Sequence, residues 1–246
     1  MNPLSTTRPI DYPDSDGMPM AENTLQFQWI VTIEGNLAAL FASRRDVFVA
    51  GDLLWYPVEG DPTIRQAPDA LVVFGRPPGH RGSYRQWDEA GIAPQVVWEI
   101  LSPGNRLAEM TRKFKFYERY GVVEYYVYDP DRHHLTGWKR DGNELKEIEA
   151  MHGFTSPLLG IRFEIDGDDL RILRPDGKPF LTFQELAEKA DRAEREKERV
   201  TSELQLANWE KDKALKEKDD AVRLVERQAE ELERLRERLK ATDKGS

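Results

Sequence analysis

An abrupt change in composition near residue 183 sets the strongest limit on how this chain can fold. All 15 prolines lie before that point, whereas residues 184–240 contain neither proline nor glycine and consist mainly of Glu, Lys, Arg, Ala and Leu. Proline and glycine destabilise a helix interior more than other residues do, so the second segment has the composition of one long helix. The sequence therefore predicts a folded domain followed by a helical tail.

The helical tail carries a heptad repeat. Seventeen positions, spaced alternately three and four residues apart, run from Phe183 to Leu239, and thirteen of them are apolar. A sustained 3.5-residue repeat is typical of a left-handed coiled coil, which would make the protein a homo-oligomer or join it to a coiled-coil partner. The remaining four positions are polar and should weaken the middle of the coiled-coil interface; they are Lys197, Lys211, Lys218 and Gln228. The alternative is a single solvated helix held by ion pairs between residues four apart.

Three segments follow from these boundaries. Residues 1–20 are rich in Pro, Asp, Ser and Gly and are expected to form a flexible arm. Residues 21–183 should form an α/β or α+β domain, and residues 184–243 the coiled-coil helix. The chain has no cysteine, no signal peptide at its N-terminus and no apolar run of the roughly 18 residues that cross a membrane. We therefore expect a cytoplasmic protein that makes no membrane contact.

Hydrophobic periodicity predicts the elements of the domain. Residues 23–41 and 105–120 have helical spacing, with Asn105 as the expected N-cap of the second helix and Gly121 at its end. Apolar or alternating runs predict a strand or hairpin arm over residues 47–56, and strands over residues 70–74, 95–101, 124–128, 135–138, 145–148, 161–165 and 169–173. Asp141 and Gly142 are typical of a hairpin turn.

Two acidic residues occupy positions where a carboxylate is costly. Glu99 lies within the apolar run 95–101, and Asp69 directly precedes the apolar run 70–74. A charged group on a core strand needs a partner, and two carboxylates at the ends of neighbouring strands could form an oxygen site for Mg²⁺ or Mn²⁺. The alternative is that Asp69 caps a turn after Pro68 while Glu99 pairs with an arginine.

The helix expected over residues 105–120 could bring a cation to these carboxylates. Glu109, Lys113 and Tyr117 are spaced four apart and therefore share one face of that helix. Only the short loop 102–104 separates the helix from the Glu99 strand, so Lys113 can reach back over the carboxylates. A cation at that point could position an attacking water or stabilise developing charge on a phosphate.

The motifs around these residues resemble those of a known family. The runs PDALVVF, VVWEILSPGNR and GVVEYYVYDP, with the pattern K-F-x-x-Y before the last of them, are similar to those of the Uma-two family of restriction-endonuclease-like proteins. That family belongs to the PD-(D/E)XK nuclease superfamily. The resemblance covers roughly residues 22–180 and implies a restriction-endonuclease-like fold, in which a mixed β-sheet is flanked by helices.

The resemblance also implies an activity and its residues. The protein would be a Mg²⁺- or Mn²⁺-dependent endonuclease that hydrolyses DNA phosphodiester bonds, with Asp69 and Glu99 as catalytic, metal-binding acids. The superfamily lysine is expected where this chain has Leu101, and in this family the next helix supplies it, here as the catalytic Lys113. The alternative is an inactive nuclease-fold protein that uses its coiled coil as a scaffold or partner-binding module.

Three further residues are candidates for supporting roles at this site. The resemblance places Glu109 at an acidic position beside the lysine, and Glu34 on a helix that often supplies another acid. Tyr117 could hydrogen-bond Lys113 or a phosphate. The alternatives are a solvated helix face for Glu34 and core packing for Tyr117.

DNA contacts are expected to be local. The loop over residues 75–87 joins the two acidic strands and combines Arg76, Arg81 and Arg85 with two aromatic residues, a combination that can contact phosphates and bases. Arg112 and Lys115, on the helix, would extend this surface. The net charge of −9 excludes a broad basic footprint, so binding should be weak and sensitive to salt. The alternative is an ordered surface loop without a ligand.

Overall fold

The computed structural model describes residues 10–15, 17, 21–167 and 169–243, with the backbone alone for residues 237–243. The chain divides into two units, Met1–Gln184 and Glu185–Ser246. The expected flexible arm over residues 1–20 lies largely outside the described residues. Within its described part, the Tyr12 ring packs on Tyr56 and Trp87 at centroid distances of 5.3 and 5.0 Å, and the Tyr56 hydroxyl donates to the Pro13 carbonyl at 2.7 Å.

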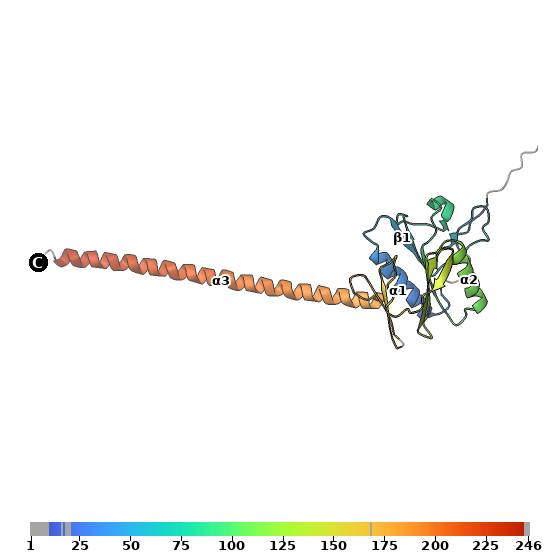
Figure 1. Ribbon diagram of the computed structural model, residues 1–246. Coiled ribbons are helices and arrows are strands. Elements are labelled where there is room, and N and C mark those ends of the chain that lie inside the picture. The colour runs from blue at the N-terminus through green and yellow to red at the C-terminus, as the bar shows by residue number, and fades with distance from the viewer. Residues whose placement is uncertain (1–9, 16, 18–20, 168, 244–246) are drawn as a thin grey trace, which may run out of the picture. The chain divides into compact units, whose positions relative to one another are not determined.

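A six-stranded mixed sheet lies at the centre of the first unit (Figure 1). In spatial order its strands are β1 (Val47–Ala50), β3 (Ala70–Phe74), β5 (Val96–Ile100), β6 (Glu124–Asp129), β7 (His134–Asp141) and β8 (Glu144–Glu147). The β5–β6 pair is parallel and the other four pairs are antiparallel. Parallel neighbours need a crossover connection, which α2 (Leu107–Arg119) provides.

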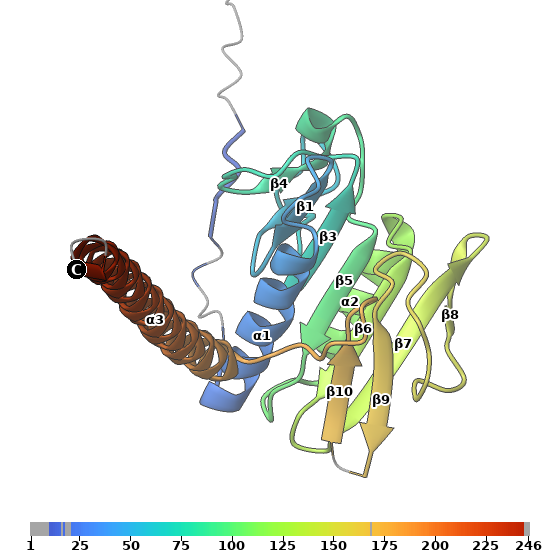
Figure 2. The ribbon, with the colours of Figure 1, turned by 90° about the vertical axis from the view of Figure 1, so that its left-hand side faces the viewer.

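Different elements cover the two faces of the sheet (Figure 2). On one face, α1 (Thr24–Leu40) and the hairpin of β9 (Arg162–Asp166) and β10 (Asp169–Leu173) pack around Trp98 and Tyr126. The other face carries a second core, which includes Trp55 and Tyr117 and is enclosed by α2 and a small parallel pair of strands. These strands are β2 (Trp55–Tyr56) and β4 (Tyr84–Arg85), and the 3₁₀ helix η1 (Gln86–Glu89) follows β4. Because side chains alternate along β5, Trp98 faces the first core and Glu99 faces α2.

The mixed α/β fold expected from the sequence is confirmed, but the N-cap expected for α2 is wrong. Arg106 occupies that position without a side-chain cap, because the Asn105 side chain is used by the preceding loop, where its Oδ1 accepts the Ser102 N–H at 2.7 Å. By contrast, Asn23 does cap α1, accepting the Gln26 N–H at 2.8 Å. The expected strand 47–56 is also divided, because β1 joins the large sheet while β2 pairs with β4.

The second unit consists of one helix among its described residues. This helix, α3 (Phe183–Asp243), is 61 residues long, and its large apolar side chains are exposed along its length. Ion pairs between residues three or four apart run along its surface, for example from Arg199 to both Glu196 and Glu203. Over the part of the chain that the structure describes, no helix combines the length and apolarity that a membrane span requires.

Candidate active site at the β5–α2 junction

Glu99 is held by two side chains of α2. Its Oε2 accepts a hydrogen bond from Lys113 Nζ at 2.8 Å, and its Oε1 accepts one from the Tyr117 hydroxyl. The two donors lie one helical turn apart, so both can reach the same carboxylate. The Glu99 side chain is only 2% exposed and that of Lys113 13%. The partner of Glu99 is therefore a lysine and not an arginine, and Tyr117 combines core packing with a polar contact.

Asp69 lies beside this group at the start of β3. Antiparallel pairing of β3 with β5 places Ala70 opposite Trp98, and Asp69 Oδ2 accepts the Ile100 N–H at 2.5 Å. Burial, followed by the negative charge of Glu99, raises the pKa of Asp69 well above its usual value, although the Ile100 N–H and Lys113 act in the opposite direction. The strand pairing thus brings together two buried carboxylates that repel each other.

Lys113 remains a cation in this environment. Burial alone would lower its pKa, but the carboxylates of Glu99 and Asp69 outweigh that effect and raise the pKa above its usual value. A lysine with a raised pKa is a hydrogen-bond donor at neutral pH and a poor general base. Lys113 can therefore stabilise negative charge, but this arrangement does not suit it to remove a proton from water.

Two residues near the carboxylates were not found from the sequence. The buried Tyr125 hydroxyl, on β6, has no hydrogen-bond partner among the described residues, and burial together with Glu99 and Asp69 raises the pKa of Tyr125. Asp52, in a turn with a φ of 47°, donates its N–H to the Pro68 carbonyl at 3.1 Å, and its charge contributes to the raised pKa of Asp69. Neither residue has a spacing that could have revealed its place without the strand register.

The two acidic candidates for supporting roles lie on different helices. Glu34, on α1, and the Asp69 backbone lie on either side of Gly51. A Cβ atom placed on Gly51 would be 3.2 Å from the Asp69 carbonyl oxygen and 3.2 Å from Glu34 Cγ. Burial raises the pKa of Glu34. Glu109 is half-buried on α2, and its charge helps to raise the pKa of Lys113.

The donor set suits a hard divalent cation that keeps several waters. No group of three or more His, Cys, Asp or Glu residues that could hold a metal ion occurs in the described part of the chain. When both are ionised, Asp69 and Glu99 provide oxygen donors with more negative charge than Lys113 balances, and the unsatisfied Tyr125 hydroxyl adds a polar group next to them. Mg²⁺ is commonly bound by one or two carboxylates, with water and substrate phosphate completing its shell.

Comparison with known proteins identifies the family. The family model Uma2, described as "Putative restriction endonuclease", matches residues 16–166. The chain belongs to the Uma2 family. The resemblance inferred from its motifs is thereby confirmed, and with it a nuclease-type family.

Solved structures and curated proteins add little to this assignment. One similar solved structure is described as "a putative nuclease belonging to DUF820 from Anabaena variabilis ATCC 29413"; it shares 17% identity, with a TM-score of 0.42 over 57% of this chain and 73% of that one. No curated protein matches the chain.

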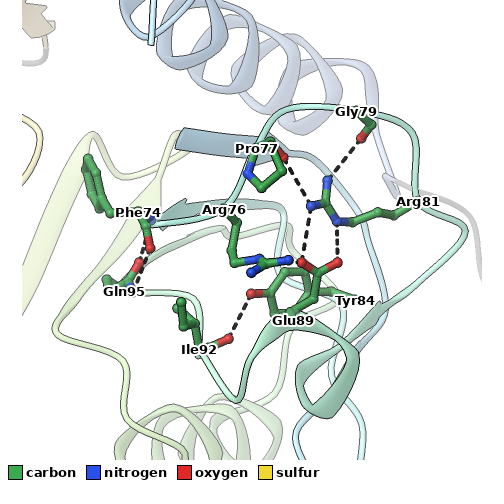
Figure 3. Close-up of polar contacts among 9 residues, drawn as sticks. All are labelled: Phe74, Arg76, Pro77, Gly79, Arg81, Tyr84, Glu89, Ile92 and Gln95. Atoms are coloured by element: carbon green, nitrogen blue, oxygen red, sulfur yellow. Dashed lines mark hydrogen bonds and ion pairs between the residues drawn. The ribbon is translucent and has the colours of Figure 1, made fainter. Parts of the chain in front are cut away.

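The arginines of the loop between the two acidic strands are engaged within this Uma2 domain (Figure 3). Arg76 Nε and Arg81 Nε each contact a Glu89 carboxylate oxygen at 2.6 Å. The Arg81 guanidinium also donates to the Pro77 and Gly79 carbonyls, and Arg85 pairs with Asp88 at 3.0 Å. These ion pairs order the loop and neutralise much of its positive charge. By contrast, Arg112 and Lys115 are exposed on α2.

A groove adjoins the carboxylate site of this Uma2 domain. It has a volume of about 720 Å³ and lies between α2 and strands β6 and β7. Its floor includes Tyr125 and Val127, and Val127 is the strand partner of Glu99. Arg106 and Arg132 also line the groove. The lining also includes Asp129 and Asp131, so the groove joins apolar and aromatic surface to side chains of both charges.

Proposed function

We propose that this protein is a Mg²⁺-dependent endonuclease that hydrolyses DNA phosphodiester bonds, with Asp69 and Glu99 as its metal-binding acids. One observation carries the proposal: two buried carboxylates and a lysine with a raised pKa converge at the β5–α2 junction in a member of the Uma2 family. Mn²⁺, which also prefers oxygen ligands, is expected to replace Mg²⁺.

The charge balance of the site supports a divalent cation. Asp69 and Glu99 would hold the ion, which supplies polarisation of a phosphoryl oxygen and a lowered pKa for bound water. Two carboxylates face one ammonium group. Burial, and after it the negative charge of Glu99, raises the pKa of Asp69, so the ionised form of Asp69 is costly in this site. A bound cation would offset this cost, whereas a purely structural pair has no evident reason to retain it.

Lys113 is the proposed stabiliser of the transition state. Its ammonium group now contacts Glu99 Oε2, while Tyr117 holds Oε1. With an ion held by Asp69 and Glu99, Lys113 would donate to a phosphate oxygen, and the Tyr117 hydroxyl would keep the Glu99 carboxylate oriented. A preorganised cation of this kind typically contributes a factor of about 10²–10³ to the rate.

DNA would approach over α2. Arg112 and Lys115 are exposed on that helix, and the groove beside it presents Arg106, while its Arg132 lies 3.7 Å from Asp129. The loop arginines are proposed to shape the site and to contribute less to phosphate binding, because Glu89 and Asp88 already pair with them. Few free cations on an acidic protein predict weak binding that falls steeply with salt.

The test is cleavage of supercoiled and linear DNA with Mg²⁺, with Mn²⁺ and with a chelator. We expect the wild type to cut only with metal, and Asp69→Asn, Glu99→Gln and Lys113→Met to lose at least about 100-fold. Lys146→Met is the matched control, because Lys146 forms an exposed ion pair with Asp141 on the β7–β8 hairpin and should leave cleavage unchanged. Equal cutting by the wild type and all variants would reveal a contaminating nuclease and refute the proposal.

A scaffold without catalysis is the second candidate. The observation that favours it is that both Glu99 oxygens already have protein partners, Lys113 and Tyr117. Calorimetric titration with Mn²⁺ separates the two functions. Binding that is lost in Asp69→Asn and Glu99→Gln, yet retained in Lys113→Met, supports the nuclease; no binding, together with no cleavage, supports the scaffold.

A further inference from the structure

The α3 helix exposes an apolar stripe along its length. Leu204 is 61% exposed, Val225 64% and Leu232 56%, and α3 is the sole element among the described residues of its unit. A lone helix in water is normally stabilised by burying such a stripe against another element. The side chains around the stripe indicate what covers it.

Each lysine on the stripe directly follows a glutamate. The pairs are Glu196–Lys197, Glu210–Lys211 and Glu217–Lys218. With Leu204 at heptad position a, these lysines occupy a and these glutamates occupy the preceding g. In a parallel two-stranded coiled coil, an a side chain packs into a hole of four partner residues, which includes the partner's preceding g residue. Each stripe lysine would therefore meet a glutamate of an identical second chain.

The remaining charges favour the same orientation. In a parallel pair, g faces the partner's e residue five positions later, and this gives no like-charge pair along α3. The g-to-e combinations are Lys189–Glu194, Glu196–Thr201, Glu203–Asn208, Glu210–Leu215, Glu217–Val222, Leu224–Ala229 and Glu231–Arg236. An antiparallel pair would place g against g: with the two helices fully overlapped, Glu196 would face Glu231 and Glu210 would face Glu217, so like charges would meet.

We propose that α3 pairs with α3 of a second copy of this chain as a parallel, in-register, two-stranded coiled coil. Three of the glutamates at g contact cations of their own helix: Glu196 and Glu203 pair with Arg199, and Glu217 lies 4.0 Å from Lys213. Such exposed pairs contribute little and can be exchanged for contacts across the interface. Two strands leave each stripe lysine near the edge of the interface, whereas three or more strands would enclose several ammonium groups together.

The orientation has a consequence for the domains. A parallel pair brings the two Phe183 ends together, so the domains attached to them are tethered to the same end of the coiled coil. Tethering raises their effective concentration to the millimolar range for short connections. The inference stands on the helix alone, and does not depend on whether the domain cleaves DNA.

Charge reversal tests whether the lysines of the stripe meet the glutamates at g of a second chain. The basic variant Glu210→Lys/Glu217→Lys and the acidic variant Lys211→Glu/Lys218→Glu should each self-associate at least about tenfold more weakly than the wild type, measured by sedimentation equilibrium. An equimolar mixture should form heterodimers. Glu198→Lys/Glu230→Lys, at outward positions, has the same charge change as the basic variant and should not alter the mass. Unchanged self-association of both variants would overturn the proposal, because the lysines of the stripe would then not meet glutamates of the partner helix.

Single cysteines test the register, since the chain contains none of its own. With oxidised glutathione, Leu232→Cys at position a should form a disulfide-linked dimer, whereas Arg223→Cys at the outward position f should not. A dimeric mass without a cross-link at position 232 would overturn the parallel register. A monomeric full-length protein at tens of micromolar would overturn the pairing itself.

Discussion

At the scale of single residues, one part of the site can be predicted from residue spacing along the sequence, and another part depends on how the strands pair. Glu99 and Lys113 belong to one strand and the helix that follows it, so the short loop was enough to predict that Lys113 lies over the carboxylates, but not that Tyr117 donates to Glu99. Tyr125 and Asp52 could not be predicted, because their proximity to the carboxylates depends on pairing between strands and on an unusual turn. The ion pair between Lys113 and Glu99 was also unforeseen, since the motif suggested a lysine directed at a phosphate.

The charge of Asp69 predicts a stability that depends on pH. Burial and Glu99 raise the pKa of Asp69, so this group favours folding below its unfolded pKa, and that contribution is lost as pH rises through its folded pKa. With a chelator present, Asp69→Asn should therefore melt at a higher temperature than the wild type at pH 7, and the difference should shrink toward about pH 4. Mg²⁺ should raise the melting temperature of the wild type but not that of Asp69→Asn.

Asp141→Asn is the control for this experiment. Asp141 is exposed and paired with Lys146, and that hydrogen bond lowers its pKa, so its removal should not stabilise the protein at pH 7. A higher melting temperature for Asp141→Asn, or none for Asp69→Asn, would contradict the account of the buried carboxylate.

At the scale of elements, periodicity located the strands and helices but not the contacts of the loops. The strands from β3 to β10 carry apolar or alternating runs that can be read directly, with the exception of the two-residue β4. Contacts such as that of Glu89 with Arg76 and Arg81 depend on how the loop folds back upon η1, and nothing in the sequence distinguishes these arginines from free cations. The same reason explains the error at Asn105, whose side chain had two possible backbone partners.

The Glu89 cluster should make the loop sensitive to acid. Its hydrogen bond with Arg81, followed by that with Arg76, lowers the pKa of Glu89; this stabilisation is present above the unfolded pKa and is lost as pH falls through the folded one. Glu89→Gln should therefore destabilise the domain by about 1–3 kcal/mol at pH 7, with a smaller difference near pH 4, measured by urea unfolding. Asp88→Asn, which breaks the exposed pair with Arg85, should have little effect at either pH. A Glu89→Gln difference that stays constant from pH 7 to pH 4 would exclude this charge as its cause.

At the scale of the whole molecule, the two units are stabilised by different means. The first unit has two cores of its own, whereas α3 has an exposed apolar stripe, which the proposed pairing would bury. The sequence revealed this division clearly, because loss of proline and glycine and the appearance of a heptad repeat coincide near residue 183. The proposed identity and orientation of the partner rest, in addition, on the charges beside the apolar stripe.

This difference predicts two thermal transitions in the full-length protein. The helix transition, followed by circular dichroism at 222 nm, should shift upward as protein concentration increases, because dissociation accompanies unfolding. Tryptophan fluorescence reports the domain transition, since five of the six tryptophans lie before residue 184. This transition should not shift with protein concentration, because the domain has cores of its own. One transition that is independent of concentration would show that α3 does not melt from an associated state.

The contact of Glu99 with Lys113 and Tyr117 also has a kinetic consequence for the domain. If α2 moved away from β5, it would leave a carboxylate without a donor in an apolar core, and such a state is costly. The buried Glu99 carboxylate therefore opposes local unfolding of α2, which supplies its hydrogen-bond donors. Amide protons of β5 and of the middle of α2 should accordingly exchange with solvent as one cooperative unit, so that the site is either fully assembled or absent.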